Sequence, residues 1–154
     1  MRALAEPVGM WTAVARRAPD TGIEWLRAAT EELWSNASAI HVHFPQAGER
    51  IGRGALEPVA GGHEAWTLAD GARTLLLRAP RERILGELDA LYRAGRADER
   101  RAILRALPYL PVGDRAVHLV QDALASDDQR LVAAALGPYA SAYLHERTRG
   151  VIEA

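Results

Sequence analysis

The sequence predicts an all-α fold, and three observations lead to this prediction. Apolar residues recur at intervals of three and four along most of the chain, as in helices with one buried face. No stretch alternates apolar and polar residues over the length of a strand. The Asp70-Gly71 pair, which could mark a hairpin, falls inside a helical pattern. Since the chain has 154 residues, we expect one domain, 1–154, of about seven to nine helices.

Two helices are expected in the first part of the chain. Residues from about 3 to 18 are rich in Ala, and Pro19 is expected to end a helix there. Thr21 stands three residues before Glu24, which is the spacing of a capping box at the start of a second helix. The apolar stripe of that helix consists of Ile23, Leu26, Ala29, Leu33 and Ala37. This stripe predicts one buried face.

The helical pattern is interrupted between residues 35 and 66. Residues 39–44 could form a short helical turn before Pro45. Residues 45–66 are rich in Gly, and we expect them to form a long loop. Because long connections are unusual inside a compact domain, this loop is expected to be either functional or loosely ordered.

Regular helical patterns return at Thr67, which stands three residues before Asp70, again the spacing of a capping box. The later helices are expected to begin at Pro80, Asp98, Asp114, and Ser126 or Asp127, with a last short helix over 139–147. Gly95 is expected to cap the end of one of these helices, because Gly readily adopts the backbone conformations found there. Pro108 should terminate or kink another.

Two of the later segments resemble each other. Residues 101–111 read RAILRALPYLP and residues 130–140 read RLVAAALGPYA, an offset of 29 residues with one helix between them. Stacked helix pairs repeat on this scale, of about 20–45 residues. The C-terminal half is therefore expected to show helical-repeat-like packing of the HEAT type. Chance similarity between two helices rich in Ala and Leu is the alternative.

Two residue types are absent, and each absence excludes some chemistry. The chain has no Cys, which excludes disulfides, thiolate nucleophiles and Cys-ligated metals. It also has no Lys, since every basic residue other than His is Arg. This excludes a phosphate-loop nucleotide site, a Schiff base and a Ser–Lys dyad. No catalytic motif is recognisable, so enzymatic activity stays open.

Charge and hydropathy point to a cytoplasmic protein without nucleic-acid or membrane partners. The formal net charge is −1, so the whole chain exerts no attraction for polyanions. No apolar run approaches the roughly 18 residues of a membrane span. Near the N-terminus, Glu6 and Pro7 interrupt the apolar stretch that a signal peptide requires.

Histidines offer two candidate sites. His41 and His43 are two residues apart and do not share one face of a helix, so no metal site is expected from them. His118 lies close to an apolar stripe and is a weak candidate for a general base, because His titrates near neutrality. A core or interface position is the alternative for His118.

Four other residues are candidates for ligand binding. Arg53 stands between Gly52 and Gly54, where it could clamp a phosphate or carboxylate, or simply tie the loop to a carboxylate. Arg73 could do the same if it faces a cavity, or it could pair with Asp70 three residues before it. The aromatic candidates are Trp66 and Tyr139. A core position explains Tyr139 equally well.

Three segments together resemble the EboA-domain family of bacterial proteins: Phe44–Gly54, Trp66–Leu77 and Leu91–Tyr139. The match covers about residues 25–143. Matching motif positions, none of which has a known catalytic role, are Gly52, Arg53, Trp66, Asp70, Arg73, Arg105, Asp128, Arg130 and Tyr139. Members of the family usually continue beyond the Tyr139 region into a further helix, and this Arg- and Ala-rich chain resembles actinobacterial members.

The resemblance implies an accessory or adaptor protein in the biosynthesis or trafficking of secondary-metabolite precursors. Its partner would be a pathway enzyme or a second copy of itself, and no cofactor is expected. The alternative is a small-molecule-binding protein, or a cofactor-free enzyme of a natural-product pathway, that acts on an anionic or aromatic substrate. It would use a cavity lined by Trp66, Tyr139 and His118, with Arg53 or Arg73 holding the anionic group.

Overall fold

The computed structural model describes residues 2–57 and 66–144, and these residues confirm the all-α prediction. They form nine α-helices and no strand. The α-helices are α1 (Met10–Arg17), α2 (Asp20–Leu33), α3 (Ile40–His43), α4 (Ala47–Ile51), α5 (Leu68–Arg78), α6 (Leu85–Ala94), α7 (Ala97–Ala106), α8 (Val117–Leu124) and α9 (Gln129–Ala135). Single 3₁₀ turns occupy Ala37–Ala39, Phe44–Gln46, Arg81–Ile84, Leu107–Tyr109 and Gly113–Ala116, and a π-helical turn occupies Ala140–Leu144.

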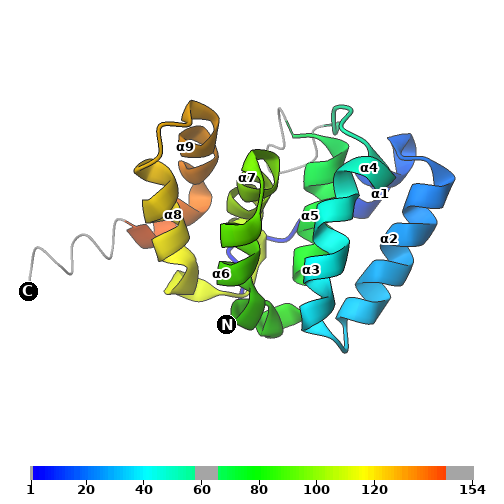
Figure 1. The fold of residues 1–154 in the computed structure, drawn as a ribbon, viewed down its shortest axis with the longest axis horizontal. Coiled ribbons are helices and arrows are strands. Elements are labelled where there is room, and N and C mark those ends of the chain that lie inside the picture. Colours follow the sequence, from blue (N-terminus) through cyan, green and yellow to red (C-terminus); the bar gives the residue numbers. More distant parts are fainter. Residues whose placement is uncertain (1, 58–65, 145–154) are drawn as a thin grey trace, which may run out of the picture.

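The helices form a row that follows the chain. In Figure 1 they stand side by side, from α2 at one end to α8 and α9 at the other. Helix α5 packs against α7, and α7 packs against α9, so these three helices lie next to one another. Helix α6 contacts α7 and α8 contacts α9. The C-terminal half is thus built from two stacked helix pairs, and the two similar segments belong to neighbouring helices, as the helical-repeat prediction requires.

The apolar stripes read from the sequence form the core. On α2, Leu26, Ala29 and Leu33 are fully buried, as predicted, whereas Ile23 is only partly buried. Helix α5 lies at the centre of the molecule, and all of its residues except the last are buried. Burial of these side chains supplies the main favourable contribution to folding.

Two helix starts differ from the prediction. Helix α1 begins at Met10 rather than near residue 3, because Gly9 has a φ of 80° and starts the helix there. Helix α2 begins at Asp20, with Pro19 as its N-cap in an extended conformation. Thr21 therefore lies inside the helix, and the predicted capping box with Glu24 is wrong. Proline before the first turn fixes the start of the helix by its restricted φ, without a side-chain cap.

The Gly-rich segment 45–66 is less irregular than predicted. Its first residues form the end of a 3₁₀ turn and then helix α4. Ala47 and Ile51 of α4 are buried, so packing against the core stabilises a helix that local propensity alone does not favour. Residues 52–57 and 66 are non-helical, and residues 58–65 of the predicted loop lie outside the described residues.

The caps of the later helices are partly as predicted. Thr67 and Asp70 form the predicted capping box of α5. Helix α9 is capped by Asp128, not by Ser126 or Asp127, because the Asp128 carboxylate accepts hydrogen bonds from two backbone N–H groups of its first turn. Helix α7 begins at Ala97, one residue before the predicted start at Asp98, and its N-cap is Arg96. The predicted cap by Asp114 is wrong, because Asp114 lies in the 3₁₀ turn Gly113–Ala116 and α8 begins only at Val117. The last expected helix is seen as the π-helical turn up to Leu144, and its remainder lies outside the described residues.

Gly95 follows α6, as predicted, but with a φ of −74°, which is an extended conformation rather than the left-handed one. Across the described residues, no helix is both long and apolar enough to cross a membrane.

Candidate functional site

The carboxylate of Asp70 connects the start of α5 with α7. It accepts a hydrogen bond from the backbone N–H of Thr67 at 2.9 Å, and the backbone N–H of Asp70 donates to the Thr67 hydroxyl at 3.1 Å. The same carboxylate oxygen accepts a hydrogen bond from Arg105 Nη1 at 2.7 Å. The predicted pair between Asp70 and Arg73 is therefore not formed, because the Asp70 carboxylate is occupied by its own helix cap and by α7.

Arg73 pairs instead with Asp98, across to α7. Its Nη1 lies 3.3 Å from the Asp98 carboxylate, and its Nε donates to the Phe44 carbonyl oxygen at 3.2 Å. The guanidinium also lies over the Phe44 ring, 5.3 Å from the ring centre. Arg73 is only 2% exposed, so it is a buried cation that connects α5 with α7 and with the 3₁₀ turn that follows α3.

The pKa of the Asp98 carboxyl is lowered by the positive charges around it. Burial by itself raises its pKa, but the Arg73 guanidinium lowers it, with help from a backbone N–H and from the charge of Arg53. The net result is a pKa below the ordinary value of 3.8. Cations therefore outweigh desolvation at this position.

Arg53 stands at the exposed edge of this region, after Gly52, whose φ is 104°. Its guanidinium folds back over α4. A Cβ placed on Gly48 would lie 2.7 Å from Nη2 of Arg53, so the absence of a side chain at Gly48 leaves room for the guanidinium.

Backbone pairing between residues 55–56 and 66–67 holds Arg53 and Trp66 beside the start of α5. Ala55 and Thr67 form an isolated antiparallel bridge, and the Leu56 N–H donates to the Trp66 carbonyl oxygen at 2.9 Å. The segment that carries Arg53 is thereby held beside the start of α5. Trp66 is brought next to the same region, with only 8% of its surface exposed.

Five arginines converge on one pocket, which we call the arginine pocket. Its volume is about 410 Å³. It is lined by Arg53, Thr67, Ala69, Asp70, Arg73, Asp98, Arg101, Arg105, Arg130 and Ala133. Five guanidinium groups face two carboxylates, which leaves three positive charges. A concave site with this excess of cations attracts anions.

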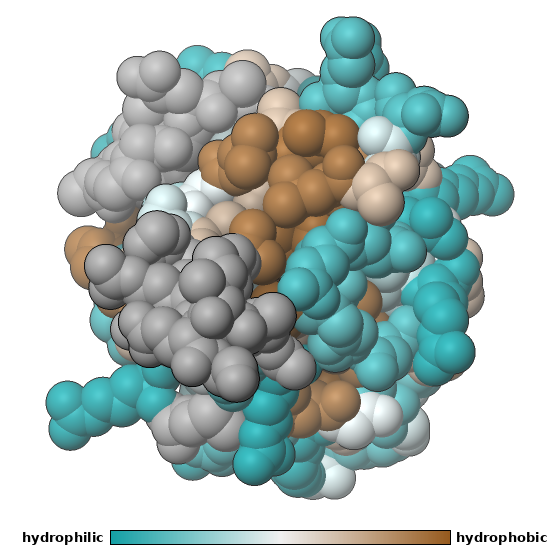
Figure 2. Space-filling model, turned by 90° about the vertical axis from the view of Figure 1, so that its left-hand side faces the viewer, coloured by the Kyte–Doolittle hydropathy of each residue, from teal (hydrophilic) through white to brown (hydrophobic). Residues whose placement is uncertain are grey.

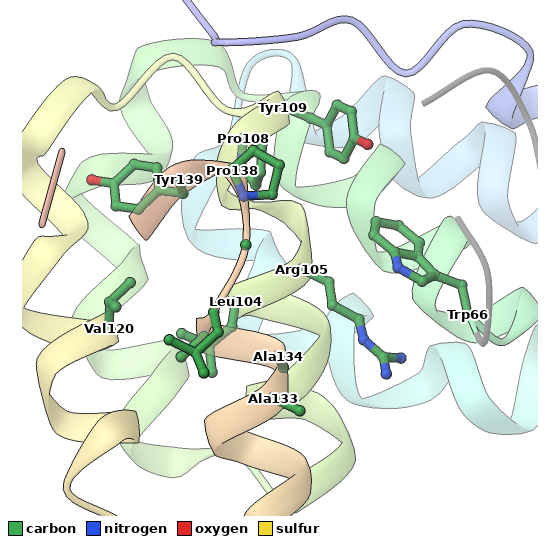
Figure 3. Close-up of a pocket in the computed structure, with 13 residues that line it drawn as sticks. Trp66, Leu104, Arg105, Pro108, Tyr109, Val120, Ala133, Ala134, Pro138 and Tyr139 are labelled. Carbon is green, nitrogen blue, oxygen red and sulfur yellow. The ribbon is translucent and has the colours of Figure 1, made fainter. Parts of the chain in front are cut away.

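A second pocket, which we call the aromatic pocket, adjoins it, and most of the residues that line this pocket are of apolar type. Its volume is about 340 Å³. It is lined by Trp66, Leu104, Arg105, Pro108, Tyr109, Val120 and residues 133–139. Trp66 and Tyr109 meet edge to face, with ring centres 6.1 Å apart. Figure 3 shows the Arg105 side chain extending between Leu104 and Ala134 on one side and Trp66 on the other.

The Tyr139 hydroxyl has a structural role in the wall of the aromatic pocket. It donates to the Gly113 carbonyl oxygen at 2.6 Å and accepts a hydrogen bond from the Ala116 N–H at 3.0 Å. Tyr139 is 3% exposed, and its ring contacts that of Tyr143, with centres 4.9 Å apart. The core position that sequence analysis allowed for Tyr139 is therefore the one observed, and its ring still contributes to the pocket wall.

The two pockets meet at α7 and α9. Arg105 of α7 and Ala133 of α9 line both of them. The aromatic pocket also includes Leu136, which is 62% exposed at the end of α9. Figure 2 shows an apolar area on the end of the molecule that α8 and α9 form. The combined site therefore has a cationic part, a part lined mostly by apolar residues, and the exposed Leu136 at its edge.

His118 does not belong to this site. It lines a different pocket, of about 460 Å³, together with Asp89, Tyr92, Arg93, Arg100, Leu119 and Asp122. Its Nε2 lies 2.5 Å from the Asp89 carboxylate, and about half of each side chain is exposed. The predicted cavity that combines Trp66, Tyr139 and His118 is thus not formed, because His118 contacts Asp89 of α6 and lines another pocket.

His41 and His43 also lie apart from the site. Nε2 of His41 is 2.8 Å from a Glu87 carboxylate oxygen, and Nε2 of His43 is 2.8 Å from one of Glu32. The two side chains thus point to different partners. Among the described residues, no group of three or more His, Asp or Glu side chains is placed to hold a metal ion.

Sequence reasoning singled out Arg53, Trp66, Arg73 and Tyr139 as ligand-binding candidates. It named Arg105 and Arg130 only as motif positions of the family resemblance, and it did not single out Arg101. The structure places Arg53 and Arg73 in the arginine pocket, and Trp66 and Tyr139 in the aromatic pocket. A signal for the missing residues was present. Arg101 and Arg105 have helical i, i+4 spacing, and Arg101 and Arg130 are the first residues of the two similar segments. Read as repeat positions on neighbouring helices, Arg101 and Arg130 are expected on the same face.

No family model matches the chain, and no match is found among curated proteins or solved structures. The resemblance to EboA-domain proteins therefore stays a prediction.

Proposed function

We propose that this protein binds a small molecule that combines an apolar, ring-sized body with an anionic group. The observation that carries the proposal is the junction of the aromatic pocket with the arginine pocket at Arg105. Each pocket falls within the range of about 300–1,000 Å³ in which small ligands are bound. Apolar walls that lead to a few convergent charges are typical of such binding sites.

The anionic group would lie among the guanidinium groups. Guanidinium forks match the oxygens of carboxylates, sulfates and phosphates and form charge-assisted hydrogen bonds with them. Arg105 is held in place by Asp70, so its orientation is fixed before a ligand arrives. Pre-organisation of this kind lowers the entropic cost of binding.

The apolar body would lie against Trp66 and the end of α9. Trp66 and Tyr109, which contact each other edge to face, and Leu104 supply apolar surface in the wall of this pocket. We assign no reaction to the site, because His118, the candidate general base, lines another pocket.

The EboA resemblance supports a biological context for this binding. In that context the ligand is a precursor of a secondary metabolite, and the protein holds it or presents it to a pathway enzyme. We expect a pathway enzyme or a second copy to bind at the edge of the aromatic pocket, where Leu136 is 62% exposed. The predicted adaptor role and the predicted binding role are then two parts of one accessory function.

Native mass spectrometry of the protein, purified from its host without denaturation, tests the proposal directly. A bound small mass that is released on unfolding would identify the ligand. A second test uses 2-naphthyl sulfate, an aromatic anion, and 2-naphthol, its uncharged counterpart, in isothermal titration calorimetry. We expect the sulfate ester to bind more tightly than 2-naphthol, because only the ester reaches the arginines with a charge.

Variants locate the binding site. Trp66→Leu is expected to weaken binding of both probes by roughly tenfold, because it removes part of the aromatic wall. Trp34→Leu is the matched control, since Trp34 is 62% exposed at the end of α2, away from both pockets. Ligand-free protein from the host together with no binding of either probe would contradict the proposal, and so would equal effects of the two tryptophan variants.

A further inference from the structure

We infer that the anionic group taken by the arginine pocket is a dianion of the phosphate-monoester type, rather than a carboxylate or another group with a single charge. This inference rests on the proposed function and adds the chemical class of the ligand. It is carried by the arginines whose side chains have no partner among the described residues, and by the three segments from which they come.

Two of the five arginines are already engaged. Arg73 is paired with Asp98 and hydrogen-bonded to a backbone carbonyl oxygen, and Arg105 is paired with Asp70 at 2.7 Å. Each carboxylate in the pocket thus neutralises one guanidinium. These pairs fix the walls of the pocket, and they leave its remaining charge to the other arginines.

The other three are Arg53, Arg101 and Arg130. None of these side chains has a hydrogen bond or an ion pair with another described residue, although Arg53 acts on Asp98 through its charge. A ligand with one negative charge would leave two of the three without a counter-charge. A ligand with two negative charges neutralises most of the excess, and each guanidinium added to the site favours the more highly charged form.

The geometry also favours a tetrahedral group with several oxygens. Arg53 follows α4, Arg101 lies on α7 and Arg130 lies at the start of α9, so the guanidinium groups approach from three elements. The three terminal oxygens of a phosphate monoester can each accept a hydrogen bond from a different direction. A carboxylate has only two oxygens in one plane, which suits one arginine fork better than three separate ones.

The same charge count disfavours a phosphodiester, such as the backbone of a nucleic acid, because a diester group carries a single negative charge. The chain as a whole has a net charge of −1, so the cationic field is confined to this pocket. The neighbouring aromatic pocket then places the apolar body of the same molecule directly beside the phosphate.

A matched pair of probes tests the inference. 2-Naphthyl phosphate and 2-naphthyl sulfate share the same rings and a tetrahedral anionic group, but near pH 7.5 the phosphate carries about two negative charges, since its second pKa is about 6. The sulfate carries one. We expect the phosphate to bind roughly tenfold more tightly than the sulfate in isothermal titration calorimetry, which corresponds to about 1.4 kcal/mol.

The pH supplies an internal control. Near pH 5 most of the phosphate is singly charged, so the preference for phosphate over sulfate is expected to shrink toward one. The sulfate keeps its charge at both pH values and reports any change in the protein itself.

Variants assign the preference to residues. Arg101→Gln and Arg130→Gln are each expected to reduce the phosphate-to-sulfate ratio by severalfold, with little effect on 2-naphthol. Neither side chain has a hydrogen-bond partner among the described residues, so both variants should fold, which thermal unfolding would verify. Arg27→Gln is the control for loss of one charge, because Arg27 is exposed on α2 and lines neither pocket.

The outcomes separate the inference from the proposed function. If both esters bind equally well, the dianion inference is wrong while the proposed binding of an aromatic anion stands. If the phosphate is preferred but the ratio is the same in Arg101→Gln, Arg130→Gln and the control, the assignment to these arginines is wrong. If no probe binds, both proposals fail.

Discussion

Substitution of Asp70 by Ala probes the carboxylate on which both the start of α5 and the arginine pocket depend. The change removes the acceptor for the Thr67 N–H and the partner of Arg105. Both losses occur in a region where the Asp70 side chain is 6% exposed. The fold and the site should therefore respond together.

The expected loss of stability follows from these two contacts. Loss of half of a capping box costs about 0.5–2 kcal/mol. Loss of the ion pair would cost several kcal/mol if both groups were buried, but Arg105 is 24% exposed and can turn toward water. Its contribution is therefore about 1–2 kcal/mol. The free energy of unfolding is expected to fall by about 1.5–4 kcal/mol, and the melting temperature by roughly 3–16 °C.

Urea denaturation followed by circular dichroism measures this loss. Asp128→Ala is the matched control, because Asp128 caps α9 through its carboxylate and has no ion pair with another described residue. We expect that control to cost about 1 kcal/mol. A double-mutant cycle of Asp70→Asn with Arg105→Gln then isolates the coupling of the pair, expected at about 0.5–2 kcal/mol.

Equal losses in Asp70→Ala and Asp128→Ala would refute the reasoning, because the connection to α7 would then contribute nothing. A coupling energy of zero in the cycle would lead to the same conclusion for the ion pair alone.

Three further predictions concern stability. Gly22→Ala is expected to lower the free energy of unfolding by more than about 2 kcal/mol, since its Cβ would lie 2.3 Å from a backbone carbonyl oxygen of α4. Gly86→Ala in α6 is expected to be neutral or stabilising by up to about 1 kcal/mol, because its Cβ would meet nothing within 4 Å; equal effects of the two variants in urea denaturation would contradict this. Tyr92→Phe is expected to be neutral or stabilising, because the buried Tyr92 hydroxyl has no hydrogen-bond partner among the described residues. Tyr139→Phe loses two hydrogen bonds and is expected to lower the free energy of unfolding by about 1–3 kcal/mol. A lower melting temperature for Tyr92→Phe than for Tyr139→Phe would be inconsistent with the structure. Asp98→Asn is expected to lower stability at neutral pH. Burial raises the pKa of Asp98 in the folded protein, but the Arg73 guanidinium outweighs it and holds this pKa below the ordinary 3.8, so the deficit of the variant should shrink as the pH falls below 3.8 and the wild-type carboxylate is protonated. A deficit independent of pH between about 7 and 2 would count against the ion pair.

Local signals in the sequence predicted the class of fold and several boundaries correctly. The stripe of α2 and the capping box of α5 depend on residues within a few positions of one another, so spacing alone reveals them. The predicted capping box at Thr21 failed because a neighbouring Pro fixed the start of the helix first. Helix α4 was missed because its stability comes from burial of Ala47 and Ile51, which local sequence does not show.

The candidate site was predicted in fragments. Arg53 and Arg73 were recognised as possible anion ligands, and Trp66 and Tyr139 as aromatic wall residues, but they were combined with His118 into a cavity that does not form. His118 lies on α8, and a wrong assumption about which side of α8 faces the site is enough to place its side chain in the wrong pocket. Spacing shows which residues share a face, and it does not show which other face lies opposite.

The sequence by itself determined that the chain is helical, where most helices end, and that thiolate and amine chemistry are excluded, because these properties depend on composition and on neighbours in the chain. Only the tertiary structure decided the partners of the charged side chains. Asp70 pairs with a residue 35 positions away and Arg73 with one 25 positions away, although Asp70 and Arg73 are themselves well spaced to pair. The physical reason is that the packing of α5, α7 and α9 sets the distances between side chains. These distances select the ion pairs, and they decide which arginines have no partner among the described residues.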